Sequence, residues 1–246
     1  MIATVISLIV CASKLISGPQ GSKDNSTPAL PNTYLVGIVK QMQMDWPNNR
    51  SILIVAHGHS VPAGYFRTPE VRTFDFYPHL LHIGLAERFP HAVVNVMVTA
   101  IGGENSESGA IRFERDVLAR RPDIVTIDYS LNDRGIGLER ARVAWTKMII
   151  AAQAQGVRVV LLTPTPDQSA SQTDPNDPLK THAIQVRNLA RELHTGLVDS
   201  AEIFQQAVAN GVELKSLMSQ VNHPNRQGHT LVAAKLLEWF PLSTSR

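Results

Sequence analysis

Residues 51–60 read SILIVAHGHS, an almost wholly apolar run over 51–56 that leads into a loop with Gly58 and Ser60. Short apolar runs of this kind predict strands that are buried on both faces. Similar runs recur along the chain, and segments with helical periodicity lie between them. We predict strands at 51–56, 92–98, 123–128, 157–163 and 196–199, and helices at 77–89, 108–120, 138–155, 177–194 and 226–240.

This alternation of strands and helices predicts an α/β fold with a parallel sheet covered by helices on both faces. The first strand is not followed by a Gly-x-Gly-x-x-Gly pattern, so a dinucleotide-binding fold has no support. In parallel sheets, ligands bind at the carboxyl ends of the strands. Four loops therefore matter: those after residues 56, 98 and 128, and the one before the last helix.

The composition narrows the possible functions. Hydrophobic residues make up 43% of the 246 and charged residues 18%, which excludes a disordered or fibrous chain. The net charge is only +2 and no basic tract is visible, so nucleic acid is not an expected partner. The one cysteine, Cys11, cannot form an internal disulfide. No apolar run reaches the length of a membrane-spanning helix, so we expect no stable membrane insertion.

The chain divides into two predicted parts. Residues 1–10 form an uncharged apolar stretch, and small residues follow at Cys11 and Ala12, as in a short signal peptide that lacks its basic start. Residues 17–33 are rich in Ser, Pro, Gly and Asn and predict a flexible linker. We expect a signal segment plus linker over 1–33, a catalytic domain over 34–246, and export to the periplasm or medium. The alternative is a frayed N-terminal segment or a misplaced start on a cytoplasmic protein.

Each of the four loops carries at least one residue that could take part in a reaction. Ser60 follows the first strand, and the paired glycines Gly102 and Gly103 follow the second. Asn132 follows the third strand, and His223 precedes the last helix. Taken singly, each has an ordinary structural explanation: a turn or cap serine, a tight glycine turn, a turn asparagine and a structural histidine.

Together the four loops resemble the SGNH (GDSL) hydrolase family over about residues 50–240. The resemblance implies a three-layer, flavodoxin-like domain with about five parallel strands. Ser60 would be the nucleophile and His223 its general base. The backbone N–H groups of Ser60 and Gly103 and the side-chain amide of Asn132 would form the oxyanion hole, with Gly102 as the fallback for Gly103. The matching blocks are Gly58-His59-Ser60, Gly102-Gly103, Ser130-Leu131-Asn132-Asp133 and His223-Pro224-Asn225.

These residue types suit acyl transfer on chemical grounds. A serine hydroxyl is a poor nucleophile unless a base lies within hydrogen-bond reach. Attack on an ester creates an oxyanion, and each donor aimed at that oxygen is worth roughly 3 kcal/mol. An asparagine amide can donate there without carrying charge.

Three positions depart from the family pattern. His59 and Ser130 stand where the family usually has Asp and Gly, and Gln220 stands where it usually has the Asp that orients the histidine. A backbone carbonyl, Gln220 itself or an acid from another loop would then have to orient His223. The candidate acids are Asp75, Glu104, Asp133 and Asp167.

We expect no cofactor and no metal. His57, His59 and His223 could in principle hold a metal ion, but no carboxylate or cysteine spacing supports such a site. We interpret His57 and His59 as polar loop residues at the rim of the pocket. Asp128 and Asp199, at strand ends, are interpreted as capping or hydrogen-bonding residues.

The predicted function is serine-dependent hydrolysis of carboxylic esters, with an O-acetyl group on a carbohydrate as the favoured substrate by analogy to exported members of the family. The partner would be a small-molecule or polysaccharide acyl ester, and Arg67, Arg72 and Arg134 flank the loops where an acidic sugar could bind. The alternatives are a lipase, lysophospholipase or thioesterase, or a catalytically weak carbohydrate-binding protein with this fold. The sequence shows no amphipathic lid, which disfavours a lipase.

Overall fold

A computed structural model describes residues 29–171 and 173–242 of the chain. The predicted signal segment and most of the predicted linker lie outside these residues, so the division at residue 34 stays a prediction. The described chain opens with two short helices, α1 (Pro31–Tyr34) and α2 (Val36–Met42). Leu35, between the two helices, and Val39 and Met42 of α2 are buried in the core.

A five-stranded parallel sheet forms the centre of the molecule, which confirms the predicted fold class. The strands lie in the order β2-β1-β3-β4-β5, so the chain crosses to the other side of β1 after β2. Ligands bind where strand order reverses in this way. The strands are β2 (Val93–Val98), β1 (Ser51–Gly58), β3 (Ile124–Asp128), β4 (Arg158–Leu162) and β5 (Gly196–Val198).

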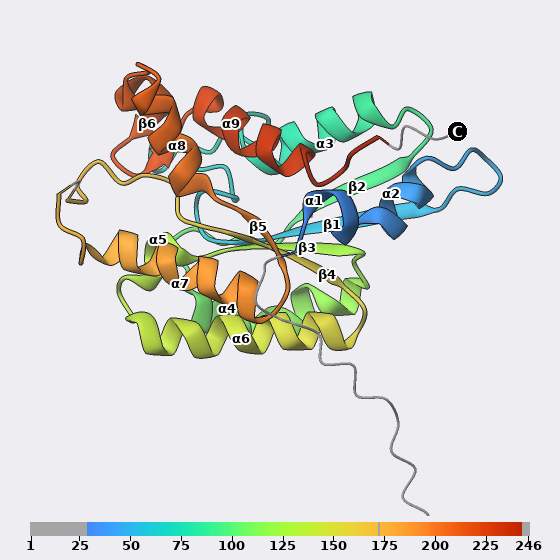
Figure 1. The fold of residues 1–246 in the computed structure, drawn as a ribbon, viewed down its shortest axis with the longest axis horizontal. Helices are drawn as coiled ribbons and strands as arrows, with labels where there is room; N and C mark the ends of the chain where they lie inside the picture. Colours follow the sequence, from blue (N-terminus) through green and yellow to red (C-terminus); the bar gives the residue numbers. More distant parts are fainter. Residues whose placement is uncertain (1–28, 172, 243–246) are drawn as a thin grey trace, which may run out of the picture.

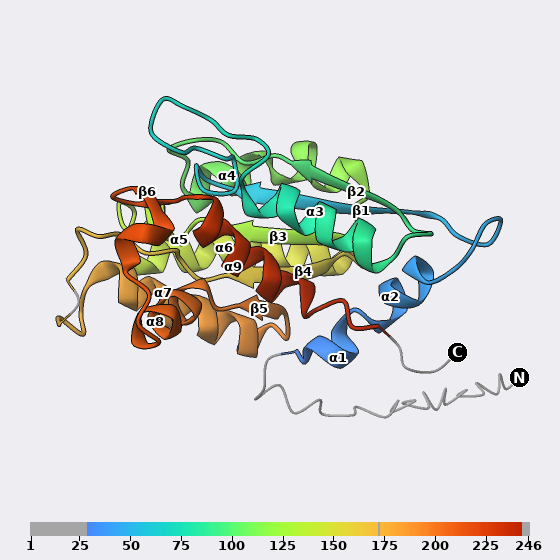
Figure 2. The same cartoon turned by 90° about the horizontal axis from the view of Figure 1, so that it is seen from above.

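Helices cover both faces of the sheet (Figures 1 and 2). Alternate strand residues point to opposite faces, and each face has its own core: Ile54 belongs to one apolar cluster and Val55 to the other. Figure 1 shows α3, α8 and α9 on one side and α4, α6 and α7 on the other. Their bounds are α3 (Tyr77–Arg88), α4 (Ser106–Asp116), α6 (Leu138–Ala154), α7 (Pro178–Glu192), α8 (Ser200–Ala209) and α9 (Arg226–Leu237). No helix in the described part is long and apolar enough to cross a membrane.

Several short elements were not predicted. α5 (Ser130–Asp133) is a single turn, and β6 (Met218–Gln220) pairs with β7 (His223–Pro224) in a small antiparallel hairpin. The two 3-10 turns are η1 (Leu118–Arg120) and η2 (Leu214–Leu217). Segments of two to four residues are too short to show periodicity. Their conformations depend on what they pack against.

Some predicted boundaries were wrong by a few residues. β1 continues to Gly58 because His57 and Gly58 still pair with β3. α4 begins at Ser106 rather than at residue 108, since Asn105 caps it by accepting a hydrogen bond from the N–H of Ser108. α9 ends at Leu237, before the predicted residue 240.

Candidate active site

Ser60 lies directly after β1, at the carboxyl edge of the sheet. The backbone at residue 58 passes so close to β3 that only glycine fits, because a Cβ there would lie 2.4 Å from the carbonyl oxygen of Asp128. The backbone N–H of His59 donates to that same oxygen at 3.1 Å and pins the loop to β3. Ser60 is nearly buried, with 8% of its surface exposed.

His223 reaches Ser60 from the opposite end of the chain. The β6–β7 hairpin carries His223, and Asn225 caps α9 just behind it by accepting from the N–H groups of Gln227 and Gly228. The Nε2 atom of His223 lies 2.8 Å from the Oγ of Ser60. This is hydrogen-bond distance, as a nucleophile and its general base require.

Gln220 contacts the other ring nitrogen of His223. The two residues face each other across the hairpin, and the Nε2 of Gln220 lies 2.8 Å from Nδ1 of His223. The Oε1 of Gln220 accepts from the backbone N–H of Thr68 at 3.0 Å, which holds the amide in this orientation. With the amide in this orientation Nδ1 accepts, whereas the backbone carbonyl of Phe66, which also contacts the ring, accepts from the protonated imidazole. A general base needs the reverse tautomer, which a 180° rotation of the Gln220 amide would stabilise.

None of the four candidate acids takes the place of Gln220, because each has another partner. Asp75 and Asp167 form ion pairs at 2.7 Å with Arg226 and Arg134 respectively. Asp133 accepts hydrogen bonds at 2.7 Å from the N–H of Ser106 and the indole of Trp145. Glu104 binds Arg112 at 2.7 Å. Of the options left open by the sequence, the structure places two on the ring: Gln220 itself and a backbone carbonyl, that of Phe66.

The loop after β2 holds the predicted oxyanion donor Gly103. Its φ of +79° is the left-handed conformation that favours glycine. Gly102 is required for a different reason: a Cβ there would lie 2.7 Å from the ring of Tyr65. Among the described residues, the N–H groups of Ser60 and Gly103 donate to no protein acceptor. Both remain available to a substrate oxygen.

Asn132 lies on α5, and its amide donates to the carbonyl oxygen of Glu104 at 2.9 Å. This bond ties the loop after β3 to the loop after β2, next to Gly103. An amide has two N–H donors, so one remains for a substrate. The oxyanion roles of Asn132 and Gly103 and the catalytic roles of Ser60 and His223 stay predictions, now with a consistent geometry.

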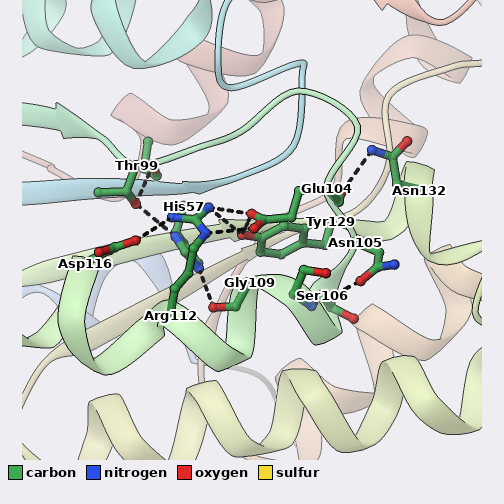
Figure 3. Close-up of polar contacts among 12 residues, drawn as sticks. His57, Thr99, Glu104, Asn105, Ser106, Gly109, Arg112, Asp116, Tyr129 and Asn132 are labelled. Carbon is green, nitrogen blue, oxygen red and sulfur yellow. Dashed lines mark hydrogen bonds and ion pairs between the residues drawn. The ribbon is translucent and has the colours of Figure 1, made fainter.

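A buried polar network supports this pair of loops (Figure 3). Arg112 on α4 forms a two-pronged contact with Glu104, and both side chains are only 9% exposed. The hydroxyl of Tyr129 donates to Glu104 at 2.8 Å. Burial, joined by the charge of Glu104, raises the pKa of Tyr129, so its phenol stays a neutral donor. This network was not predicted from the sequence, where its sign is the pair of opposite charges at residues 104 and 112.

The interpretation of His57 and His59 as residues at the pocket rim was wrong, since both are fully buried. The ring nitrogens of His57 contact the hydroxyl of Thr99 at 2.8 Å and the carbonyl of Gly109 at 3.2 Å. Those contacts occupy both ring nitrogens of His57, so it cannot join His59 and His223 in a metal site. Over residues 29–171 and 173–242, no group of three His, Cys, Asp or Glu side chains is placed to hold a metal ion.

Comparison with known proteins agrees with this arrangement. Residues 56–231, which contain all four loops, match the family of GDSL-like lipases and acylhydrolases. The chain belongs to the GDSL-like lipase/acylhydrolase family. The match confirms the resemblance detected in the sequence. No curated protein matches the chain in sequence.

Solved structures share the fold of this GDSL-like protein at low identity. A two-domain esterase (CEX) active on acetylated mannans, co-crystallised with mannopentaose, has a TM-score of 0.70 at 20% identity, over 87% of this chain. The chain spans only 54% of that esterase. Axe2, an acetylxylan esterase from Geobacillus stearothermophilus, has a TM-score of 0.67 at 20% identity, with 79% of this chain and 96% of Axe2 covered.

The pH dependence of the GDSL-like site follows from the surroundings of His223. Burial, with a smaller contribution from the charge of His59, lowers the pKa of His223 to about 4. A base works only when unprotonated, so kcat/KM should fall as pH drops through about 4 and stay level above it. A pH profile of kcat/KM from pH 3 to 8 tests this. An acid limb at or above pH 6.5 would contradict it.

Gln220→Glu should shift the acid limb of the kcat/KM profile to higher pH. Glutamate has the length of glutamine, so one oxygen can accept from Nδ1–H of His223 while the other keeps the N–H of Thr68. A carboxylate beside the ring favours the imidazolium and raises its pKa, typically by about 1 unit or more. It also stabilises the tautomer that a base needs. The same pH profile measures the shift, and Gln168→Glu, a substitution in the neighbouring loop, is the control. An unmoved limb would mean that residue 220 does not govern the ring.

Arg112→Gln should destabilise the fold. It leaves the mostly buried carboxylate of Glu104 with the Tyr129 hydroxyl but no positive partner. Breaking a buried ion pair from one side costs about 3–5 kcal/mol. Urea unfolding measures the loss, with Arg115→Gln as the control, because the Arg115 side chain is 77% exposed and solvent screens its pair with Asp116. Equal losses in the two variants would contradict the prediction.

Proposed function

We propose that the protein is a serine esterase that removes O-acetyl groups from a carbohydrate. The observation that carries the proposal is the 2.8 Å contact between Ser60 Oγ and His223 Nε2 at the edge of the sheet where the glycine and asparagine loops converge. Membership of the GDSL-like family supports the ester hydrolysis. The carbohydrate follows from the fold-level likeness to esterases named for acetylated mannan and acetylxylan.

The reaction proceeds in two halves. Ser60 Oγ attacks the acyl carbon while its proton passes to Nε2 of His223, and the carbonyl electron pair moves onto the oxygen. N–H groups of Ser60, Gly103 and Asn132 receive that oxyanion. His223 then returns the proton to the departing sugar oxygen, which leaves an acetyl group on Ser60. Water then attacks the acetyl carbon while His223 takes its proton, and the bond between the acetyl carbon and Oγ breaks as His223 gives that proton to Oγ. This releases acetate and regenerates Ser60.

The position of Tyr65 favours a short acyl group. Its ring packs on Gly102, and its centroid lies 6.2 Å from that of His223. The half-buried ring thus lies beside both His223 and the glycine loop, where it would border the acyl group of a bound ester. Acetyl is the acyl group that this confinement suits best.

The loop arginines lend less support to an acidic sugar, because each has a partner within the protein. Arg67 donates to the carbonyl of Ser219 at 3.0 Å, and Arg72 stacks on Phe66 with its guanidinium 3.5 Å from the ring centre. Arg134 pairs with Asp167. A neutral acetylated polysaccharide is therefore the better first substrate.

Acetate release from acetylated mannan and acetylated xylan tests the proposal, with chemically deacetylated polymer and the Ser60→Ala variant as controls. We expect acetate only from the acetylated polymers and only with the unaltered serine. A p-nitrophenyl ester series from acetate to octanoate, run in parallel, should show the highest kcat/KM on acetate.

Other outcomes would select the alternatives. Faster hydrolysis of octanoate than acetate would indicate a lipase, lysophospholipase or thioesterase. Binding of polysaccharide without release of p-nitrophenol or acetate would indicate a carbohydrate-binding protein. Export, the expected location for an enzyme acting on polysaccharide, remains part of this proposal and rests on the apolar residues 1–10.

A further inference from the structure

His59 and Asp128 form a buried pair beside the nucleophile, on a different part of the site from Gln220. Nδ1 of His59 lies 3.5 Å from Oγ of Ser60. Its Nε2 lies 3.3 Å from Oδ1 of Asp128, and the two side chains are 0% and 2% exposed. The order of groups is therefore serine, imidazole, carboxylate.

The proton on His59 is placed by its neighbours. The backbone N–H of Val61 donates to Nδ1 at 3.2 Å, so Nδ1 presents its lone pair and Nε2 carries the hydrogen, facing Asp128. Within the described chain, neither Nε2 of His59 nor Oδ1 of Asp128 has a hydrogen-bond partner. The other carboxylate oxygen accepts from the hydroxyl of Tyr77 at 3.3 Å. The carboxylate of Asp128 thus lies between the imidazole of His59 and the hydroxyl of Tyr77.

His223, the proposed base on the other side of Ser60, has no carboxylate beside its ring. Nδ1 of His223 faces the neutral amide of Gln220, and the acids Asp75, Glu104, Asp133 and Asp167 have other partners. When Ser60 gives up its proton, positive charge develops on His223. A buried carboxylate lowers the energy of such a charge even without touching it, because screening is weak in the interior.

We propose that Asp128, acting through His59, supplies the negative charge for the Ser60–His223 reaction that Gln220 does not supply. Both are positioning residues. The ring of His59 lies next to the hydroxyl of Ser60, and Asp128 lies on the far side of that ring. This inference deepens the proposed esterase function and rests on it. It explains why a histidine and an aspartate are buried together at the active serine while the base is bonded to an amide.

A double-mutant cycle tests the proposal, using the full chain and p-nitrophenyl acetate. The four proteins are wild type, Asp128→Asn, Gln220→Glu and the double variant. Asp128→Asn should lower kcat by roughly tenfold or more with little change in KM, which is less than the roughly 10⁴-fold loss from neutralising a directly bonded triad carboxylate. Gln220→Glu should raise kcat at least tenfold more in the Asp128→Asn background than in wild type, because it restores the missing charge.

Asp133→Asn serves as the matched control. Asp133 is also buried, but it bonds the Ser106 N–H and the Trp145 indole, so Gln220→Glu should not compensate for its loss. Equal effects of Gln220→Glu in all backgrounds, or an Asp128→Asn variant with kcat within twofold of wild type, would overturn the inference. A wild-type protein without esterase activity would instead overturn the proposed function.

A second variant covers the case in which Asp128→Asn does not fold, as judged by circular dichroism and thermal unfolding. His59→Asn keeps a side-chain acceptor near the Val61 N–H but removes the ring that links Asp128 to Ser60. It should show the same loss of kcat and the same rescue by Gln220→Glu. A loss that Gln220→Glu does not reduce would mean that His59 has only a packing role.

Discussion

Ser60→Ala should abolish acyl-ester hydrolysis while leaving the fold intact. Alanine removes the hydroxyl oxygen that lies 2.8 Å from the Nε2 of His223, so the base loses its nucleophile. Loss of a serine nucleophile typically costs about 10⁶-fold in kcat. Release of p-nitrophenol from p-nitrophenyl acetate measures activity, and thermal unfolding checks the fold. The effect on stability should be small, because the substitution deletes a single oxygen.

Ser200→Ala is the matched control for this result. Ser200 is also buried at the carboxyl side of the sheet, at the start of α8, and no described residue bonds its hydroxyl. Its replacement should leave kcat/KM within about twofold, as expected for a side chain remote from the reaction. If Ser60→Ala kept more than a few per cent of wild-type activity, the nucleophile assignment would have to be abandoned.

Asn132→Ala should lower kcat by roughly 10²–10³ with little change in KM, the usual cost of one oxyanion donor. The amide matters twice, because it is a predicted donor to the substrate oxygen and it also bonds the carbonyl of Glu104 next to Gly103. Steady-state kinetics on p-nitrophenyl acetate separates kcat from KM. A change confined to KM would assign Asn132 to substrate binding.

Asn105→Ala provides the control for Asn132. Asn105 is a nearby asparagine whose side chain caps α4 by accepting from the N–H of Ser108. Loss of this cap should cost about 1 kcal/mol of folding free energy. It should leave kcat within severalfold, whereas Asn132→Ala should do the reverse: a large loss of kcat and a small loss of stability.

The hydrophobic patterns determined the sheet and the long helices. Runs such as 51–56 and 157–163 have few alternatives to a buried parallel strand, and the segments between them repeat every three to four residues. Helix α8 and the β6–β7 hairpin were not predicted, because their conformations depend on a cap or on tertiary contacts rather than on a hydrophobic pattern. α8 is ten residues long and begins at the Asp199 cap, and the β6–β7 hairpin pairs only a few residues.

By itself, the sequence determined the fold class and the family. It also determined the candidate serine, histidine and amide groups of the site, because the residue types at the predicted strand ends can be identified from the sequence. Only the tertiary structure decided the partners of those residues. Gln220 on His223, Glu104 on Arg112 and Asp128 beside His59 are separated by 3, 8 and 69 positions, and no periodicity links them. Asp128 and His59 meet because the parallel strands β1 and β3 bring their carboxyl ends to one edge, whereas Gln220 and His223 meet across the β6–β7 hairpin and Glu104 meets Arg112 where the loop after β2 packs on α4. Burial there makes each charge depend on the group packed against it.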